Sequence, residues 1–119
     1  MSDAIVLGPG EGEILERPGV RTHRVLAELP EFEVIEMTFE PGWEGVDAHT
    51  HADHVDSFYV LEGEVEFLLG DRRIRGGPGT YVAVPQGVVH SFRNAGPGAI
   101  RVLNVPAPNV GFTEGLRGG

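Results

Sequence analysis

Turn-forming glycine and proline residues divide this 119-residue chain into short segments, and this division limits the folds that it can adopt. Turn pairs stand at Pro18-Gly19, Pro41-Gly42 and Gly70-Asp71. Between such pairs apolar and polar residues alternate with the period of a strand that is buried on one face, as at residues 34–39. No segment shows the 3.6-residue period of an amphipathic helix. The pattern predicts an all-β fold, an antiparallel sandwich or barrel.

About ten short strands are expected, joined by turns. They include residues 13–17, 20–28, 32–40, 55–61, 64–69, 72–75, 80–84, 88–93 and 99–105. The length suits one domain, residues 1–119, with a core of its own. Residues 1–12 and 106–119 are rich in glycine and proline and are expected to form arms or loops.

Four of the five histidines lie in two segments, residues 49–63 and 79–94. His49 and His51 are two residues apart, so in an extended strand both imidazoles point to the same face. His90 would add a third imidazole from a distant strand. Asp56 follows His51 by five residues, an odd spacing, so the chain is expected to turn or bulge near residues 52–54. Imidazoles with a carboxylate are ligands for a divalent transition metal.

Both segments resemble the two motifs of the cupin superfamily. In the first, His-x-His is followed after four residues by a carboxylate, and after six further residues by Gly63. The second is completed at the family's spacing by Gly79, Pro85, Gly87, His90 and Asn94. The short distance between the motifs is similar to that of small bacterial cupins of the conserved-barrel, quercetinase-like type. The resemblance covers about residues 32–105 and implies an antiparallel jelly-roll β-barrel, or double-stranded β-helix, with a metal inside one end.

The resemblance implies one divalent transition metal per chain (Fe, Mn, Ni, Co, Cu or Zn), held by His49, His51, Asp56 and His90. The family usually has Glu where this chain has Asp56, and the shorter side chain leaves three alternatives: direct ligation, ligation through water, and a site of three histidines. His54 is an alternative ligand if the strand already includes it; otherwise it is a loop histidine at the barrel mouth. In dioxygenase members the carboxylate also acts as a base, which makes Asp56 a candidate catalytic residue.

Strand alternation also predicts a substrate pocket, because apolar side chains share the faces of Asp56 and His90. The residues expected to line it are Met37, Phe58, Val60 and Phe92. Trp43 and Phe112 are candidates for covering its mouth or for a dimer contact. His23 lies outside both motifs and is interpreted as an ordinary strand residue.

The net charge of −9 is unevenly distributed, with 13 acidic residues and three arginines in residues 1–60. Such an acidic chain is not expected to bind nucleic acid or an anionic membrane. The absence of cysteine and lysine excludes thiolate ligands, disulfides and Schiff-base chemistry on lysine. The N-terminus lacks the basic residues and the long apolar run of a signal peptide, so a cytoplasmic location is expected.

Three function classes remain open. The first is a metal-dependent dioxygenase acting on a small enolic or phenolic substrate. The second is an isomerase or lyase of a small sugar or keto acid, in which the metal acts as a Lewis acid. The third is a non-catalytic cupin that binds a small ligand. In each class the partner is a small molecule, and the resemblance implies a homodimer.

Overall fold

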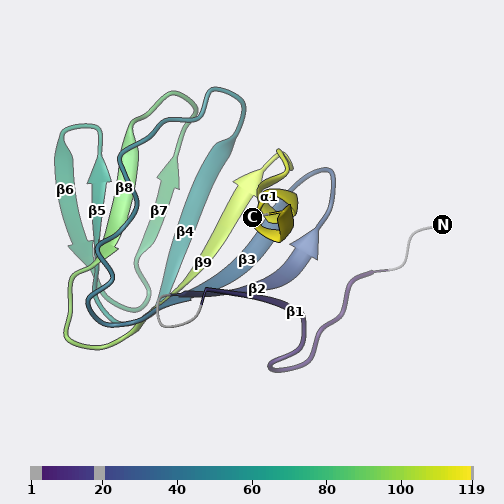
Figure 1. Ribbon diagram of the computed structural model, residues 1–119. Coiled ribbons are helices and arrows are strands. Elements are labelled where there is room, and N and C mark those ends of the chain that lie inside the picture. Colours follow the sequence, from purple (N-terminus) through teal and green to yellow (C-terminus); the bar gives the residue numbers. More distant parts are fainter. Residues whose placement is uncertain (1–3, 18–20, 119) are drawn as a thin grey trace.

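The computed structural model describes residues 4–17 and 21–118, so the turn predicted at Pro18-Gly19 lies outside the described residues. Nine strands and one helix follow one another along the chain (Figure 1). They are β1 Glu13–Arg17, β2 Arg21–Glu28, β3 Glu33–Phe39, β4 Val55–Glu62, β5 Val65–Leu69, β6 Arg72–Gly76, β7 Tyr81–Val84, β8 His90–Asn94, β9 Ile100–Ala107 and α1 Phe112–Gly118. The nine strand ranges predicted from the sequence are therefore confirmed, with ends that differ by at most two residues.

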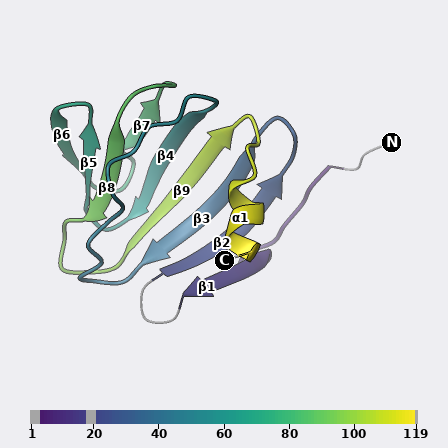
Figure 2. The same cartoon turned by 45° about the horizontal axis from the view of Figure 1, so that its top comes forward.

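The strands form two antiparallel sheets, which curve around a common interior (Figures 1 and 2). The larger sheet has the order β1-β2-β3-β9-β4-β7, and the smaller one has the order β6-β5-β8. Chain neighbours are separated in the large sheet, where β9 lies between β3 and β4. The predicted all-β jelly-roll fold is confirmed.

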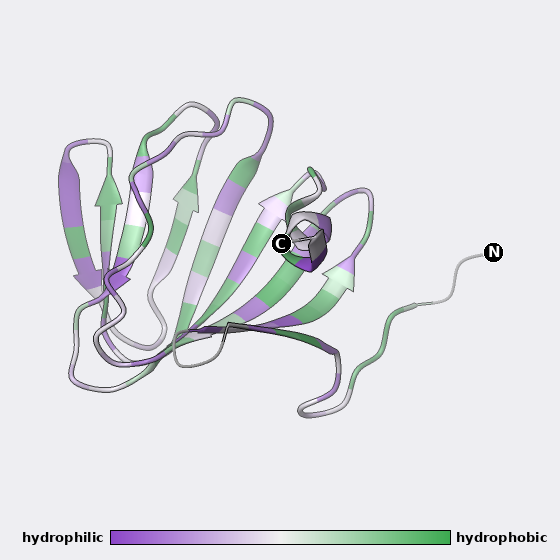
Figure 3. Ribbon diagram, in the orientation of Figure 1, coloured by the Kyte–Doolittle hydropathy of each residue, from purple (hydrophilic) through white to green (hydrophobic). Residues whose placement is uncertain are grey.

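The core lies between the inner faces of the two sheets. Along several strands hydrophobic and hydrophilic residues alternate (Figure 3). On β3 the burial alternates strictly, and Ile35, Met37 and Phe39 are all buried. Phe58 of the large sheet packs against Phe67 of the small sheet, with ring centroids 5.8 Å apart. Burial of these side chains is the main stabilising contribution to the barrel, because apolar area is removed from water on both sheets.

Trp43 belongs to this core and does not line the cavity described below. Its ring stacks on Phe39 with centroids 3.7 Å apart, and it also contacts Phe92 at 5.3 Å. The expectation that Trp43 covers the pocket mouth is therefore wrong. The loop after β3 folds back over the sheet and inserts the indole among the core aromatics.

The motif glycines are turn residues. Gly63, Gly79 and Gly87 have φ angles of 82°, 93° and 81°, a region that glycine adopts without steric cost. At Gly63 there is also no room for a side chain, because a Cβ atom would lie 2.5 Å from the carbonyl oxygen of Ala99.

The C-terminal segment corrects the prediction of an arm or loop over residues 106–119. Strand β9 continues to Ala107, and residues 112–118 form the helix α1. Two views place α1 beside β2 and β3 (Figures 1 and 2). Seven residues make about two helical turns, which is too short for a 3.6-residue apolar period to be recognised.

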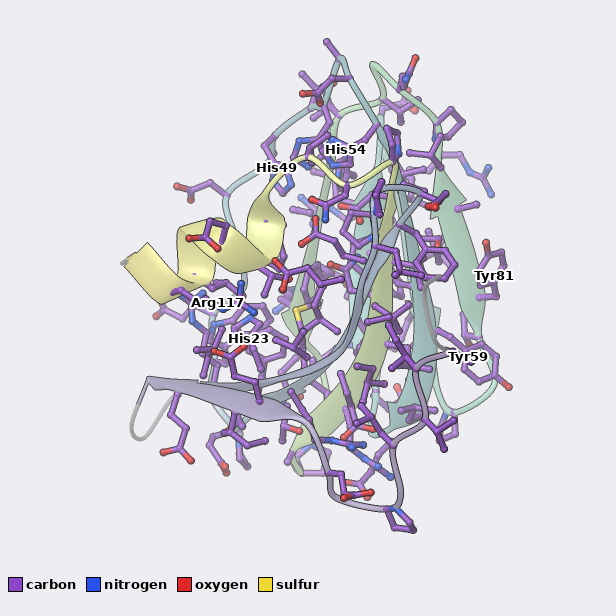
Figure 4. The ribbon with its side chains drawn as sticks, turned by 90° about the vertical axis from the view of Figure 1, so that its right-hand side faces the viewer. His23, His49, His54, Tyr59, Tyr81 and Arg117 are labelled. Atoms are coloured by element: carbon purple, nitrogen blue, oxygen red, sulfur yellow. The ribbon has the colours of Figure 1, made fainter. Side chains whose placement is uncertain are left out.

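Contacts with distant strands hold α1 at both ends. The fully buried carboxylate of Glu33 accepts hydrogen bonds from the backbone N–H groups of Phe112, at 3.2 Å, and Thr113, at 2.8 Å. Near the other end, Arg117 forms ion pairs with Glu13 at 2.6 Å and Glu28 at 2.7 Å (Figure 4). Within the described part of the chain, no helix has the length and apolarity needed to cross a membrane.

Candidate metal centre

The two histidine segments meet at one end of the barrel. His49 lies in the loop before β4 and pairs with His90, the first residue of β8, in an isolated antiparallel bridge. Two backbone hydrogen bonds of 3.0 and 2.8 Å close this bridge and bring the two imidazole centroids within 4.4 Å. The carbonyl of His51 accepts a hydrogen bond from the N–H of Gly87 at 2.8 Å. The turn of the second motif thus fixes the position of the first.

The chain bends at Ala52 and Asp53, as the odd spacing predicted, and then enters β4. Asp56 is buried on the inward face, and its Oδ2 lies 3.7 Å from Nε2 of His51 and 3.5 Å from Nε2 of His90.

Each of the four predicted ligands, His49, His51, Asp56 and His90, offers one atom within 4.8 Å of the others. Ligand distances of about 2.0–2.2 Å place atoms on opposite sides of one ion roughly 4.2 Å apart, so a small inward movement of the side chains would bring these residues onto a single metal ion.

Hydrogen bonds set the tautomers of two of these imidazoles. Nδ1–H of His49 donates to the carbonyl of Asp47 at 2.7 Å, and Nδ1–H of His90 donates to the carbonyl of Val88 at 2.9 Å. A carbonyl only accepts, so the proton lies on Nδ1 and the lone pair of Nε2 is available as a ligand. Nε2 of His90 is buried and makes no hydrogen bond to any described residue. A metal ion would satisfy this nitrogen.

The charges of the cluster also suit a cation. Burial, with the neighbouring His54 and His49, holds the pKa of His51 below its usual value, so this imidazole is neutral near pH 7. Burial raises the pKa of Asp56, but His90 and Asn104 outweigh it and hold this pKa below its usual value. For His90, burial lowers the pKa, and Asp56 and the Val88 carbonyl more than offset that effect, so it is raised. Near pH 7 the cluster therefore contains an ionised Asp56 carboxylate and a neutral His51 imidazole, and both can ligate a cation.

Asn104 positions the carboxylate and was not predicted from the sequence. Its Nδ2 donates to Oδ1 of Asp56 at 2.6 Å and to the carbonyl of Ser57 at 3.0 Å. These bonds leave Oδ2 of Asp56 turned toward the imidazoles. The sequence did contain a signal for this role. Asn104 follows Ile100 and Val102 at the inward positions of β9, where a polar amide is unexpected.

His54 borders the cluster and is not one of the four residues in it. It is buried just before β4, and its Nδ1 lies 2.8 Å from Oδ1 of Asp53. Its ring centroid is 4.1 Å from that of His51. Figure 4 shows His49 and His54 at the same end of the barrel.

A cavity of about 370 Å³ begins at the cluster. Met37, Phe58 and Phe92, which were expected to line a substrate pocket, lie in its wall, and Phe112 of α1 lines it as well. The prediction was wrong for Val60, which is fully buried in the core and does not line the cavity. Val60 shares the face of Asp56, but it lies four residues further along β4, among the side chains of the core.

The cavity wall also includes residues that the sequence did not single out. Besides Asn104, they include Arg21, His23, Pro106 and Leu116. His23, interpreted as an ordinary strand residue, is buried, and its ring lies 6.1 Å from Phe39 and 6.3 Å from Phe112. Helix α1 therefore forms part of the wall.

Comparison with known proteins agrees with this arrangement. The sequence model of the Cupin domain family matches residues 35–106, which include all four clustered residues and most of the barrel. The chain belongs to the cupin family. Quercetin 2,3-dioxygenase from Bacillus subtilis (strain 168) is 35% identical to this cupin over 92 residues, which are 74% of this chain and 27% of that enzyme. This cupin thus spans about a quarter of the length of that relative, and the similarity supports the quercetinase-like type.

Solved structures share the fold. The structure of KdgF from Halomonas sp. superposes with a TM-score of 0.78 at 20% identity, covering 90% of this cupin and 94% of that chain. An RmlC-like cupin from Shewanella frigidimarina NCIMB 400 gives a TM-score of 0.75 at 24% identity, covering 90% and 92%. At these identities the likeness establishes the barrel alone.

Proposed function

We propose that this cupin is a metal-dependent dioxygenase that acts on a small enolic or phenolic substrate. The observation that carries the proposal is the His49–His51–Asp56–His90 cluster at one end of a largely apolar cavity. The similarity to a quercetin 2,3-dioxygenase favours oxygenase chemistry over the other cupin activities. That similarity covers 27% of the relative, so the activity and the substrate are both part of the proposal.

One divalent transition metal per chain is proposed as the cofactor. Three imidazoles and a carboxylate suit Fe, Mn, Co, Ni, Cu or Zn. We propose direct ligation by Asp56, because its Oδ2 already lies within 3.7 Å of Nε2 of both His51 and His90. When bound, the metal would supply Lewis acidity and, if redox-active, the electron transfer that dioxygen chemistry requires.

The chain's own residues would bind and orient the substrate. Met37, Phe58 and Phe92 provide apolar walls that exclude water and pack against an aromatic or enolic ring. Asp56 is the candidate base for the substrate hydroxyl. Its lowered pKa makes it a weak base, so this role requires a substrate hydroxyl that is acidic in the site.

Oxygen uptake tests the proposal. Protein reconstituted separately with Fe, Mn, Co, Ni, Cu and Zn would be assayed with quercetin and with simpler enols and phenols, beside the His49→Ala/His51→Ala variant. The expected result is oxygen consumption that needs a redox-active metal and is lost in the variant. Turnover with Zn and without oxygen would instead favour an isomerase or lyase of a small sugar or keto acid. Stabilisation by a ligand without turnover would favour a binding cupin.

We also propose a homodimer that is located in the cytoplasm and has no nucleic-acid or membrane partner. Strand β7 is an edge of the large sheet, and edge strands are templates for pairing. Tyr81 on β7 is 62% exposed beside its partner Tyr59 on β4 (Figure 4). Light scattering should give twice the chain mass of 12.8 kDa. A monomer at micromolar concentration would contradict the proposal.

A further inference from the structure

Helix α1 supplies a part of the cavity wall that the strands do not supply. The larger sheet has six strands and the smaller sheet has three, and β1, β2 and β3 extend past the smaller sheet (Figures 1 and 2). The helix lies beside β2 and β3 on this side of the barrel. The ring of its first residue, Phe112, lies 6.3 Å from that of His23, a buried residue of β2. The helix therefore closes the cavity where the smaller sheet ends.

Two apolar side chains of α1 form this wall. Phe112 and Leu116 both line the cavity, and because they are four residues apart they share one face of the helix. The position of the wall is fixed at its first turn, where the Glu33 carboxylate accepts hydrogen bonds from the N–H groups of Phe112 and the fully buried Thr113. A ligand that pushed Phe112 outward would have to break these hydrogen bonds.

The space beside this wall is small. Pockets for small molecules measure about 300–1,000 Å³, and this cavity has about 370 Å³ and begins at the metal cluster. The opposite wall includes Phe58 and Phe92, which are close-packed core residues and cannot yield without strain. Phe112 is 36% exposed, so removal of its ring would extend the cavity toward solvent and would not leave an enclosed void. The size of the cavity is therefore decided at α1.

We infer that Phe112 and Leu116 set the size of the substrate and restrict this cupin to substrates with a single ring. The inference rests on the proposed function and narrows its substrate class. In an open apolar pocket a second ring strengthens binding, because more apolar area is removed from water. Against a fixed wall the same ring has no room, and its insertion displaces packed side chains. The two cases differ in the sign of the effect of the second ring.

Matched chelating probes measure that sign. Co²⁺-loaded protein would be titrated under nitrogen with 4-methylcatechol and with 3,4-dihydroxybiphenyl, which carries a second ring in place of the methyl group. The chelating end is the same in both probes, and the visible spectrum of Co²⁺ reports binding. Titrations of free Co²⁺ correct for any difference in chelation. In wild type the biphenyl should bind at least about tenfold more weakly than 4-methylcatechol.

Variants then assign the size limit to α1. Phe112→Ala should reverse the order, so that the biphenyl binds more tightly, and Leu116→Ala should reduce the discrimination. The matched control is Phe32→Ala, because Phe32 is 37% exposed and lines a second hollow with Leu26 and Leu29. This control should keep the wild-type order. If thermal melts show that Phe112→Ala does not fold, Phe112→Leu, which should reduce the discrimination, decides together with the wild-type comparison.

The outcomes separate this inference from the proposed function. A protein that binds no Co²⁺ overturns the proposed function and the inference with it. A wild-type protein that binds Co²⁺ and 4-methylcatechol, but binds the biphenyl more tightly, overturns the size limit alone. A wild-type order that persists in both Phe112→Ala and Leu116→Ala would overturn the assignment to α1. So would a Phe32→Ala variant that changes the order as much as Phe112→Ala does.

Discussion

Replacement of Glu33 should detach α1 from the barrel. The Glu33 carboxylate is fully buried and accepts two backbone N–H groups at the start of the helix, from Phe112 and Thr113. Hydrogen bonds to a charged group contribute about 1.5–3 kcal/mol each. Glu33→Ala removes both hydrogen bonds, so the free energy of unfolding should fall by roughly 3–5 kcal/mol. The loss should stay below the largest sum of the two bonds, because the backbone N–H groups of a released helix regain hydrogen bonds to water. Glu33→Gln keeps one acceptor oxygen and should cost about half as much.

Thermal and urea denaturation would measure these losses, with Glu31→Ala, an exposed acidic neighbour, as the control. Each kcal/mol should lower the melting temperature by about 3–5 °C in a chain of this size. Hydrogen exchange should show the loss of protection first at the amides of Phe112 and Thr113. Equal melting temperatures for Glu33→Ala, Glu31→Ala and wild type would refute the reasoning. So would a Glu33→Gln variant that is as destabilised as Glu33→Ala.

Three further predictions follow from the site and the helix. Asn104→Ala removes the hydrogen bond that orients Asp56 and should weaken metal binding about 10- to 100-fold in a competition titration with a chelator; unchanged affinity would contradict the positioning role. Thr113→Val should raise the free energy of unfolding in urea by about 1 kcal/mol, because the buried Oγ1 has no partner among the described residues; a loss would show that the hydroxyl is satisfied. Arg117 lowers the pKa of the Glu13 carboxyl. The ion pair between them therefore stabilises the folded protein fully above the usual pKa of 4.5, and this stabilisation is lost as the pH falls through the lowered pKa. Amide protection of α1 should fall over that acid range in wild type, and Arg117→Gln should show this acid-dependent loss weakly if at all.

Local alternation in the sequence predicted the strands, and the two family motifs predicted the histidine–aspartate cluster. Strict alternation at Ile35, Met37 and Phe39 is enough to predict a strand with one buried face. The two cupin motifs predicted that His90 would lie beside His49, although 40 residues separate them. This prediction came from the family resemblance, which implies a known barrel fold. The odd spacing before Asp56 was sufficient to predict the bend.

The features that were missed depend on contacts between distant residues. Helix α1 is held by Glu33, about 80 residues earlier, and by Glu13, 104 residues before Arg117, so its own seven residues give little signal. The lining role of Arg21 depends on the curvature of the large sheet, which alternation along one strand does not specify. Alternation also predicted that Val60 faces inward, but it could not predict how deep in the barrel this side chain lies.

Metal content tests the account most directly. Protein purified without chelators or an affinity metal would be analysed by elemental mass spectrometry, beside His49→Ala/His51→Ala and the control His54→Ala, which alters a histidine outside the cluster. We expect about one divalent transition metal per chain in wild type, retained in His54→Ala and lost in the double variant, as four converging ligands imply. Metal-free wild-type protein that also fails to bind added Co²⁺ would contradict the account, as would a double variant that keeps its metal.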